Sequence, residues 1–306
     1  MPRHSTPVAL YDTASATSDS GMTSLDELST GRLVYRGGLH LSHEDPRFGG
    51  LSAIHLDTTG SRFLAVSDRA VWVQGDLEWT AGRLTGAQIT DLAPLLAPDG
   101  TPFEGEARDS EALADLGDGL FAVSFERQHR IALYTLGADW SRTGTPARPH
   151  PAPPGADRYE NNGGMEGLTR LPHGRLLAGV ERAVNGERQL ALLDNTQWRD
   201  VRMSAEPGYG LTALATHRDH VYALERFWRR DVGNRIRILR FPTAALDGAG
   251  VIEPERLGEL EAGMAVDNFE GLAILERDGE TLLILVSDDN FSANQRTLML
   301  AFALTP

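Results

Sequence analysis

The feature that most constrains the fold is a degenerate internal repeat that occurs five times along the chain. Each repeat has an apolar-rich strand, a turn of Gly or Asp, and a second strand, which is the pattern of a β-hairpin. The first strands begin near residues 52, 111, 166, 212 and 270, so the repeat recurs at intervals of 59, 55, 46 and 58 residues. The hairpins span residues 50–69, 109–127, 164–182, 210–226 and 268–289.

A third strand-like segment follows each hairpin. These segments cover residues 70–74, 130–136, 189–194, 235–241 and 297–304. A period of roughly 40–60 residues with three or four strands per unit is typical of a β-propeller, whereas helical repeats would need long stretches of 3.6-residue periodicity. The sequence therefore predicts an all-β fold, a single propeller of five blades, with a sixth blade possible in segments 75–107 or 137–160.

The ends of the chain predict how the ring closes. The last unit has only three strands, and the strand-like segment 32–41 belongs to no unit. We expect this segment to complete the last blade, because closure removes free sheet edges. The predicted organisation is a flexible or irregular segment at residues 1–30 and one propeller domain at residues 31–306.

Composition excludes several classes of protein. The net charge of -14 disfavours nucleic-acid binding and docking to anionic membranes, since both require basic surfaces. The absence of Cys excludes thiol catalysis, disulfides and Cys-bound metals. No apolar run is long enough to cross a membrane, and no signal peptide is visible. We expect a monomer that is cytoplasmic as written, or periplasmic or secreted if an export signal was removed.

Acidic residues recur at two positions of the repeat. The start of the first strand carries Ser52, Glu111, Glu166, Thr212 and Glu270, and the end of the second strand carries Asp68, Glu126, Glu181, Glu225 and Asp288. These two positions are adjacent in an antiparallel hairpin, so all ten side chains are expected around one mouth of the channel. Eight of them are acidic, and crowded carboxylates need bound cations, basic partners or shared protons.

Arg follows the second acidic position in four of the five units. The four are Arg69, Arg127, Arg182 and Arg226, and Asp289 takes this place in the fifth. One interpretation is that the acid–Arg pairs are salt bridges between blades. The other is that the Arg residues bind substrate, together with Asn162, Asn268 and Asn290. Glu111, Glu166 and Glu270 have no Arg beside them in sequence, which favours a functional role for these three.

The side chains predicted around the mouth offer oxygen ligands and no sulfur. Such a site suits a hard divalent cation, Ca²⁺ first, with Mg²⁺ or Mn²⁺ as alternatives. The predicted ligands are Asp68, Glu111, Glu166, Glu181, Glu225, Glu270, Asp288 and Asp289. Glu111, Glu166 and Glu270 are the candidate catalytic carboxylates. His129 lies just beyond Glu126 in sequence and is a candidate general acid or base.

Several segments resemble the bacterial phytase-like family, which is described as having esterase-like activity. The resemblance is carried by residues 33–54, 67–69, 109–113, 161–168 and 267–290, and it extends from about residue 31 to 304. It implies that Glu111, Glu166, Glu270, Asp68 and Asp288 are active-site groups. The implied reaction is hydrolysis of a phosphoric or other ester, with a metal ion as an aid.

Three functions follow from these observations. The leading hypothesis is a metal-assisted hydrolase of a small phosphate ester, with Glu166 or Glu270 as the base. The second is a carboxylic-ester or lactone hydrolase on the same scaffold, because the fold does not determine the substrate. The third is a non-catalytic propeller that binds a ligand or partner and whose carboxylates are structural.

Overall fold

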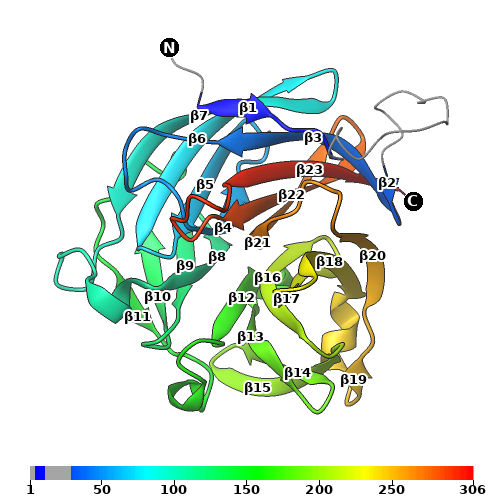
Figure 1. The fold of residues 1–306 in the computed structure, drawn as a ribbon. Coiled ribbons are helices and arrows are strands. Elements are labelled where there is room, and N and C mark those ends of the chain that lie inside the picture. The colour runs from blue at the N-terminus through cyan, green and yellow to red at the C-terminus, as the bar shows by residue number, and fades with distance from the viewer. Residues whose placement is uncertain (1–3, 11–28, 306) are drawn as a thin grey trace.

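Five β-sheets surround a central channel in the computed structural model of the protein, which describes residues 4–10 and 29–305 (Figure 1). Each sheet is one blade, so the predicted all-β propeller of five blades is confirmed. Blade 1 contains β4 (Leu51–Leu56), β5 (Arg62–Ser67), β6 (Val71–Thr80) and β7 (Arg83–Pro94). Blade 2 contains β8 (Ser110–Gly117), β9 (Leu120–Phe125), β10 (Arg130–Thr135) and β11 (Arg148–His150).

The remaining three blades follow in chain order around the ring. Blade 3 contains β12 (Met165–Arg170), β13 (Leu176–Val184), β14 (Glu187–Asp194), β15 (Gln197–Ser204) and β19 (Val251–Ile252). Blade 4 contains β16 (Tyr209–His217), β17 (His220–Arg229), β18 (Gly233–Pro242) and β20 (Glu255–Leu260). Blade 5 contains β21 (Asn268–Arg277), β22 (Glu280–Asp288), β23 (Leu298–Leu304) and β3 (Leu33–Leu41).

The segments that could have held a sixth blade belong to the five that exist. Residues 75–107 contain the outer half of blade 1, and residues 137–160 contain β11 of blade 2. Short 3₁₀ turns occupy Gly105–Arg108, Ala156–Arg158, Pro172–Gly174 and Thr243–Asp247. None of the helices in the described part of the chain has the length and apolar character needed to span a bilayer.

The N-terminal strand closes the ring as predicted. β3 pairs antiparallel with β23 and forms the outer part of blade 5. Within residues 1–30, Ser5–Pro7 (β1) and Ser29–Thr30 (β2) also pair with β3, while residues 1–3 and 11–28 lie outside the described residues. The two ends of the propeller are therefore held in one sheet.

A β-bulge interrupts the inner strand of every blade at the same place. In blades 1, 3, 4 and 5 the ladder skips one residue of the inner strand, and in blade 2 two residues, Glu111 and Ala112, stand opposite Ser124 alone. A bulge bends the strand and redirects the side chain of the extra residue. The bulged residues are Ser52, Glu111, Glu166, Thr212 and Glu270, the first repeated position identified in the sequence.

A small residue follows each bulge and allows neighbouring inner strands to come close. In blade 5 this residue is Gly271, where a Cβ atom would lie 2.4 Å from Cγ2 of Val286 and 3.2 Å from Cα of Ala53. In blade 3 it is Gly167, where a Cβ would lie 2.6 Å from Cγ of Leu214. The close approach of the inner strands brings the bulged residues together around the channel.

Closure by β3 depends on burial of its apolar face. Leu39 is fully buried in the core shared by blades 5 and 1, and it pairs with Met299 of β23. We predict that Leu39→Ala lowers the free energy of unfolding by about 2–5 kcal/mol, because the substitution leaves a cavity. His40→Ala, one residue along the same strand, should cost less than about 1 kcal/mol. Urea denaturation measures both, and equal losses would show that β3 does not seal the ring.

Candidate functional site

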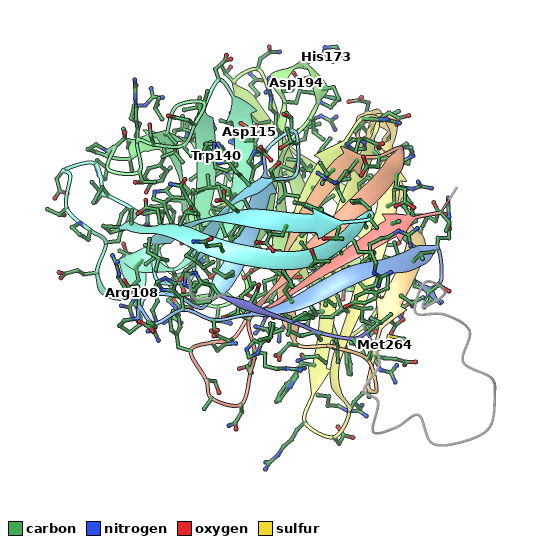
Figure 2. The ribbon with its side chains drawn as sticks, turned by 90° about the horizontal axis from the view of Figure 1, so that it is seen from above. Arg108, Asp115, Trp140, His173, Asp194 and Met264 are labelled. Carbon is green, nitrogen blue, oxygen red and sulfur yellow. The ribbon has the colours of Figure 1, made fainter. Side chains whose placement is uncertain are left out.

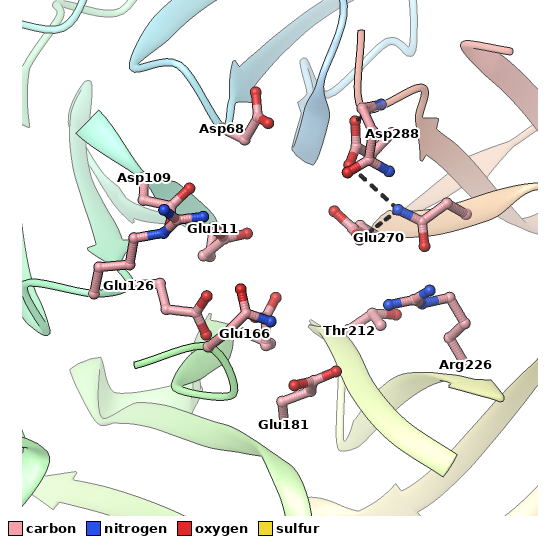
Figure 3. A pocket seen from close by; sticks show the side chains of 14 residues that line it. Asp68, Asp109, Glu111, Glu126, Glu166, Glu181, Thr212, Arg226, Glu270 and Asp288 are labelled. Atoms are coloured by element: carbon pink, nitrogen blue, oxygen red, sulfur yellow. Dashed lines mark hydrogen bonds and ion pairs between the residues drawn. The ribbon is translucent and has the colours of Figure 1, made fainter. Parts of the chain in front are cut away.

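One mouth of the channel opens into a cavity of about 210 Å³ whose lining is almost entirely polar (Figure 3). Eight of the lining side chains are acidic and two are Arg. The lining consists of Asp68, Asp109, Glu111, Glu126, Arg127, Asn162, Glu166, Glu181, Thr212, Arg226, Asn268, Glu270, Asp288 and Asn290. The structure thus brings most of the residues predicted from the repeat into one site.

Four of the five bulged residues reach the cavity. Glu111, Glu166 and Glu270 line it, and Thr212 lines it from blade 4. The Thr212 hydroxyl donates a hydrogen bond to the carbonyl oxygen of Phe269 at 3.0 Å, which links blade 4 to blade 5. Ser52 is buried but does not line the cavity.

The second repeated position is acidic in four blades rather than five. In blades 1, 2 and 3 the backbone N–H of this acidic residue donates a hydrogen bond to the carbonyl oxygen of the residue two places before the bulge. The three pairs are Asp68 with Gly50, Glu126 with Asp109, and Glu181 with Gly164. In blade 4 the residue two places before the bulge is Gly210, and the residue that pairs with Gly210 is Arg226. The alignment that put Glu225 in the ring is therefore wrong by one residue, and Arg226 takes the ring position.

Glu225 instead forms a buried ion pair away from the cavity. Its Oε1 atom lies 2.8 Å from a guanidinium nitrogen of Arg188, and the two residues are 1% and 0% exposed. Arg188 belongs to blade 3, so the pair joins blades 3 and 4. The sequence pattern allowed salt bridges between blades, and Glu225 forms one. Its partner is Arg188 and not Arg226, the Arg that follows it in sequence.

Asp109 is a lining residue that the repeat alignment did not single out. It lies two residues before Glu111, the same offset that separates Asn268 from Glu270, so that comparison could have found it. Carboxylate oxygens of Asp109, Glu111 and Glu126 lie within 4.8 Å of one another, close enough to hold one ion. We call these three residues the blade-2 triad.

The four Arg residues predicted to bind substrate have different surroundings. Arg127 lines the cavity and is paired with Asp109 at 2.5 Å. Arg226 also lines it, and its guanidinium has no hydrogen bond or ion pair with any described residue. Arg69 stacks on Phe291 at 3.2 Å from the ring centroid, and Arg182 pairs with Glu160, both outside the lining.

The predicted Asn residues line the cavity, whereas Asp289 does not. The carboxylate of Asp289 accepts hydrogen bonds from the backbone N–H of Gly50 and the hydroxyl of Thr297, each at 2.9 Å, and so holds the loop after β22. Asn162 and Asn290 line the cavity from loops. His129 lies outside the lining.

His129 packs behind the loop that carries Gly164. Its Nε2 atom lies 3.0 Å from the carbonyl oxygen of Glu160, and its ring makes an edge-on contact with Tyr159. A Cβ atom on Gly164 would meet the His129 ring at 2.4 Å, so the imidazole abuts the backbone of the loop. The Glu126 side chain approaches the same point, with its Cγ atom 3.4 Å from that Cβ, so His129 lies beside Glu126 at Gly164 but outside the cavity lining.

Asn268 ties two of the carboxylates together. Its side-chain amide donates hydrogen bonds to Oε1 of Glu270 at 2.7 Å and to Oδ2 of Asp288 at 3.2 Å, the dashed lines of Figure 3. The residue is only 3% exposed, and its Oδ1 atom has no hydrogen-bond partner among the described residues. A buried carbonyl oxygen without a partner is costly, and a ligand in the cavity would satisfy it.

Burial raises the pKa of the central carboxyls. For Glu111, Glu166 and Glu270 desolvation is the largest cause, and neighbouring carboxylates add to it, so each pKa lies well above its usual value. Burial and then Asp288 raise the pKa of Asp68 to about 7. Burial likewise raises the pKa of Asp288 to about 6. Such shifts are typical of functional sites.

The donor set of the cavity fits a hard divalent cation. All of its possible ligands are oxygens, from carboxylates, amides and one hydroxyl, and the chain has no Cys. Ca²⁺ takes six to eight such oxygens, which a crowded site can supply. The blade-2 triad and the unpartnered Oδ1 of Asn268 are the two features of the site that a cation or its ligands would satisfy.

The fold and the site together define a β-propeller with a carboxylate-lined cavity at one channel mouth. A family model described as phytase-like, with the esterase-like activity of phytase, matches residues 46–291. The chain therefore belongs to the phytase-like family. No curated protein matches the sequence.

Solved structures share the fold at low sequence identity. An exo-β-1,3-galactanase from Phanerochaete chrysosporium is 10% identical with a TM-score of 0.51, over 83% of this chain and 60% of that chain. A β-1,3-galactosidase of glycoside hydrolase family 43 is also 10% identical with a TM-score of 0.51, over 81% of this chain and 55% of that chain. The chain thus spans little more than half of these proteins, and the likeness concerns the propeller fold.

The raised pKa values predict how stability depends on pH. Asp68 and Asp288 keep a proton in the folded protein at pH values where the unfolded chain, with a pKa near 3.9, has released it. Their contribution to stability is complete below about pH 4 and is lost as pH rises towards 7. With EDTA present, Asp68→Asn should therefore raise the melting temperature by several degrees at pH 8 and have little effect at pH 4. Thermal unfolding at both pH values tests this, and an equal shift at the two values would contradict it.

The position of Glu225 predicts a structural phenotype. Glu225→Gln leaves the buried Arg188 guanidinium without its counter-charge and should lower the free energy of unfolding by about 3–5 kcal/mol. Glu181→Gln is the matched control, because burial raises the pKa of Glu181 and removing its charge relieves repulsion in the cavity. Chemical denaturation in EDTA should therefore find Glu181→Gln at least as stable as the parent. Similar destabilisation by both variants would contradict the assignment.

Proposed function

We propose that this protein is a divalent-cation-assisted ester hydrolase that acts on small phosphate esters. The observation that carries the proposal is the cavity at the channel mouth, lined by eight acidic side chains and only two Arg, with three carboxylates within 4.8 Å of one another. Such a cavity repels an anionic ester unless a cation reverses its potential. The membership of the chain in the phytase-like family supports an ester as the substrate.

The blade-2 triad is the group of residues that would hold the cation. Glu126 is already oriented, because its Oε1 atom accepts backbone N–H groups of Gly163 and Gly164 at 2.5 and 2.6 Å. Glu166 lies nearby, since Glu111 and Glu126 are the neighbours that most raise its pKa after burial. Ca²⁺ is the first candidate, with Mg²⁺ or Mn²⁺ as alternatives. When bound, the cation would supply Lewis-acid polarisation of the ester and a more acidic water.

Glu270 is the residue that we assign as general base. It lies across the cavity from the triad, and its carboxylate is the strongest charged neighbour of Glu111. The amide of Asn268 fixes its orientation at 2.7 Å. Burial raises its pKa, which suits a carboxylate that accepts a proton from water near neutral pH. Glu166 is the alternative base, but its place beside the triad favours cation binding.

A carboxylic ester or lactone is the second candidate substrate. The family description names esterase-like activity without specifying phosphorus or carbon at the scissile bond. The same triad could polarise a carbonyl oxygen as well as a phosphoryl oxygen. The two candidates differ in substrate charge, so a panel that contains phosphate monoesters, aryl acetates and lactones separates them.

The test combines cation binding with turnover. Titration calorimetry should detect Ca²⁺ binding to the parent protein, and Glu111→Gln should weaken it at least tenfold. Glu270→Gln should retain cation binding and lower kcat for phosphate-ester hydrolysis by about 10²-fold, the usual range for loss of a general base. EDTA should abolish turnover and Ca²⁺ should restore it.

The matched control is Glu280→Gln, at the opposite end of β22 from Asp288 and in a partly exposed pair with Arg36. It should alter neither cation binding nor turnover. A protein that binds no divalent cation, or whose activity is indifferent to EDTA, would contradict the proposed function.

A further inference from the structure

Blade 4 is the one side of the cavity that contributes no carboxylate. Blade 1 supplies Asp68, and blades 2, 3 and 5 each supply at least two acidic side chains to the lining. Blade 4 supplies only Thr212 and Arg226. The potential of the cavity is therefore asymmetric, and an anionic group is repelled least along blade 4.

Arg226 is available to a ligand. Its guanidinium makes no hydrogen bond and no ion pair with any described residue, whereas the guanidinium of Arg127, the other Arg of the lining, is paired with Asp109. It is close enough to Glu181 and Glu270 to lower their pKa values partly against the effect of burial. Figure 3 shows its guanidinium directed into the cavity from the blade-4 side.

Trp228 lies on the same face of β17 as Arg226, one step further from the cavity. Side chains two residues apart on a strand share a face and stand about 6.6 Å apart. The intervening Phe227 is on the other face, where its ring packs against Tyr209 at 5.4 Å. Trp228 is 60% exposed, and only Val184 is a more exposed large apolar residue in the described chain.

We propose that Arg226 and Trp228 form a substrate-binding wall that selects anionic esters with a ring-shaped apolar group. Arg226 would bind an anionic oxygen of the ester, because a guanidinium forms paired hydrogen bonds with phosphate and carboxylate oxygens. Trp228 would stack on the ring of the alcohol part, since an indole offers a large, rigid apolar surface. This inference rests on the proposed function and adds to it the class of substrate.

The spacing of the two residues along the strand sets what such a substrate requires of their side chains. A phosphorus atom and a phenyl ring joined through one oxygen have centres about 4 Å apart, whereas the two residues are roughly 6.6 Å apart along the strand. The long Arg226 side chain would therefore incline toward Trp228 to bind the phosphate oxygens while the indole covers the ring. An alkyl ester of the same charge would reach Arg226 but leave the Trp228 surface uncovered. Among anionic esters of equal charge, the wall therefore discriminates by the alcohol part of the ester.

The experiment compares phenyl phosphate with methyl phosphate in the presence of Ca²⁺. In the parent, kcat/KM should favour the phenyl ester, and Trp228→Ala should lower this preference about tenfold, mainly through KM. Trp228→Phe should restore most of the preference because it keeps an aromatic face. Val184→Ala, which removes the other highly exposed apolar side chain, is the matched control and should leave the preference as in the parent. An unchanged preference in Trp228→Ala would overturn the proposal.

Binding of phosphonates distinguishes failure of this inference from failure of the proposed function. If the parent hydrolyses neither ester, the proposed function fails, and calorimetry with phenylphosphonate and methylphosphonate then decides the inference. Tighter binding of phenylphosphonate, lost in Trp228→Ala, supports the wall, whereas equal binding of the two by the parent overturns it. Arg226→Gln should weaken binding of both phosphonates about tenfold, and unaltered binding would remove Arg226 from the wall.

Discussion

The functional site depends on one repeated backbone irregularity, the β-bulge near the start of each inner strand. Each bulge takes one residue out of the hydrogen-bonded ladder, and in four of the five blades the side chain of that residue lines the cavity at the channel mouth. The small residues after the bulges, such as Gly167 and Gly271, allow the inner strands to approach. Together the two features place the Glu side chains of blades 2, 3 and 5 around the cavity.

This arrangement brings eight acidic side chains close together, and their desolvation and mutual repulsion are unfavourable. Two kinds of interaction offset part of this cost. At the edge of the cavity Arg127 neutralises Asp109, and backbone N–H groups stabilise Glu126. In the centre Glu111, Glu166 and Glu270 are left with raised pKa values and with few partners. This contrast between a compensated edge and a centre of crowded carboxyls supports the proposal of a bound cation.

Blade 4 departs from the repeat, and its departure gives the cavity a direction. It carries Thr212 at the bulge and Arg226 at the second ring position, so its contribution is neutral or basic. The acid that the repeat leads one to expect, Glu225, is used instead in a buried pair with Arg188 that holds blades 3 and 4 together. One face of β17 thus carries Glu225, which joins blades 3 and 4, and the other face carries Arg226, which lines the cavity.

The sequence by itself determined the five hairpins, the closure by segment 32–41 and the presence of Glu111, Glu166 and Glu270 at the channel mouth, because these follow from alternation, turns and a repeated position. Only the tertiary structure decided which face Glu225 and Arg226 occupy, since a shift of one residue in register exchanges the two faces of a strand. It also brought Asp109 into the triad and placed His129 against Gly164, outside the cavity lining. Those positions depend on contacts between blades and loops far apart in the chain, which local sequence patterns do not encode.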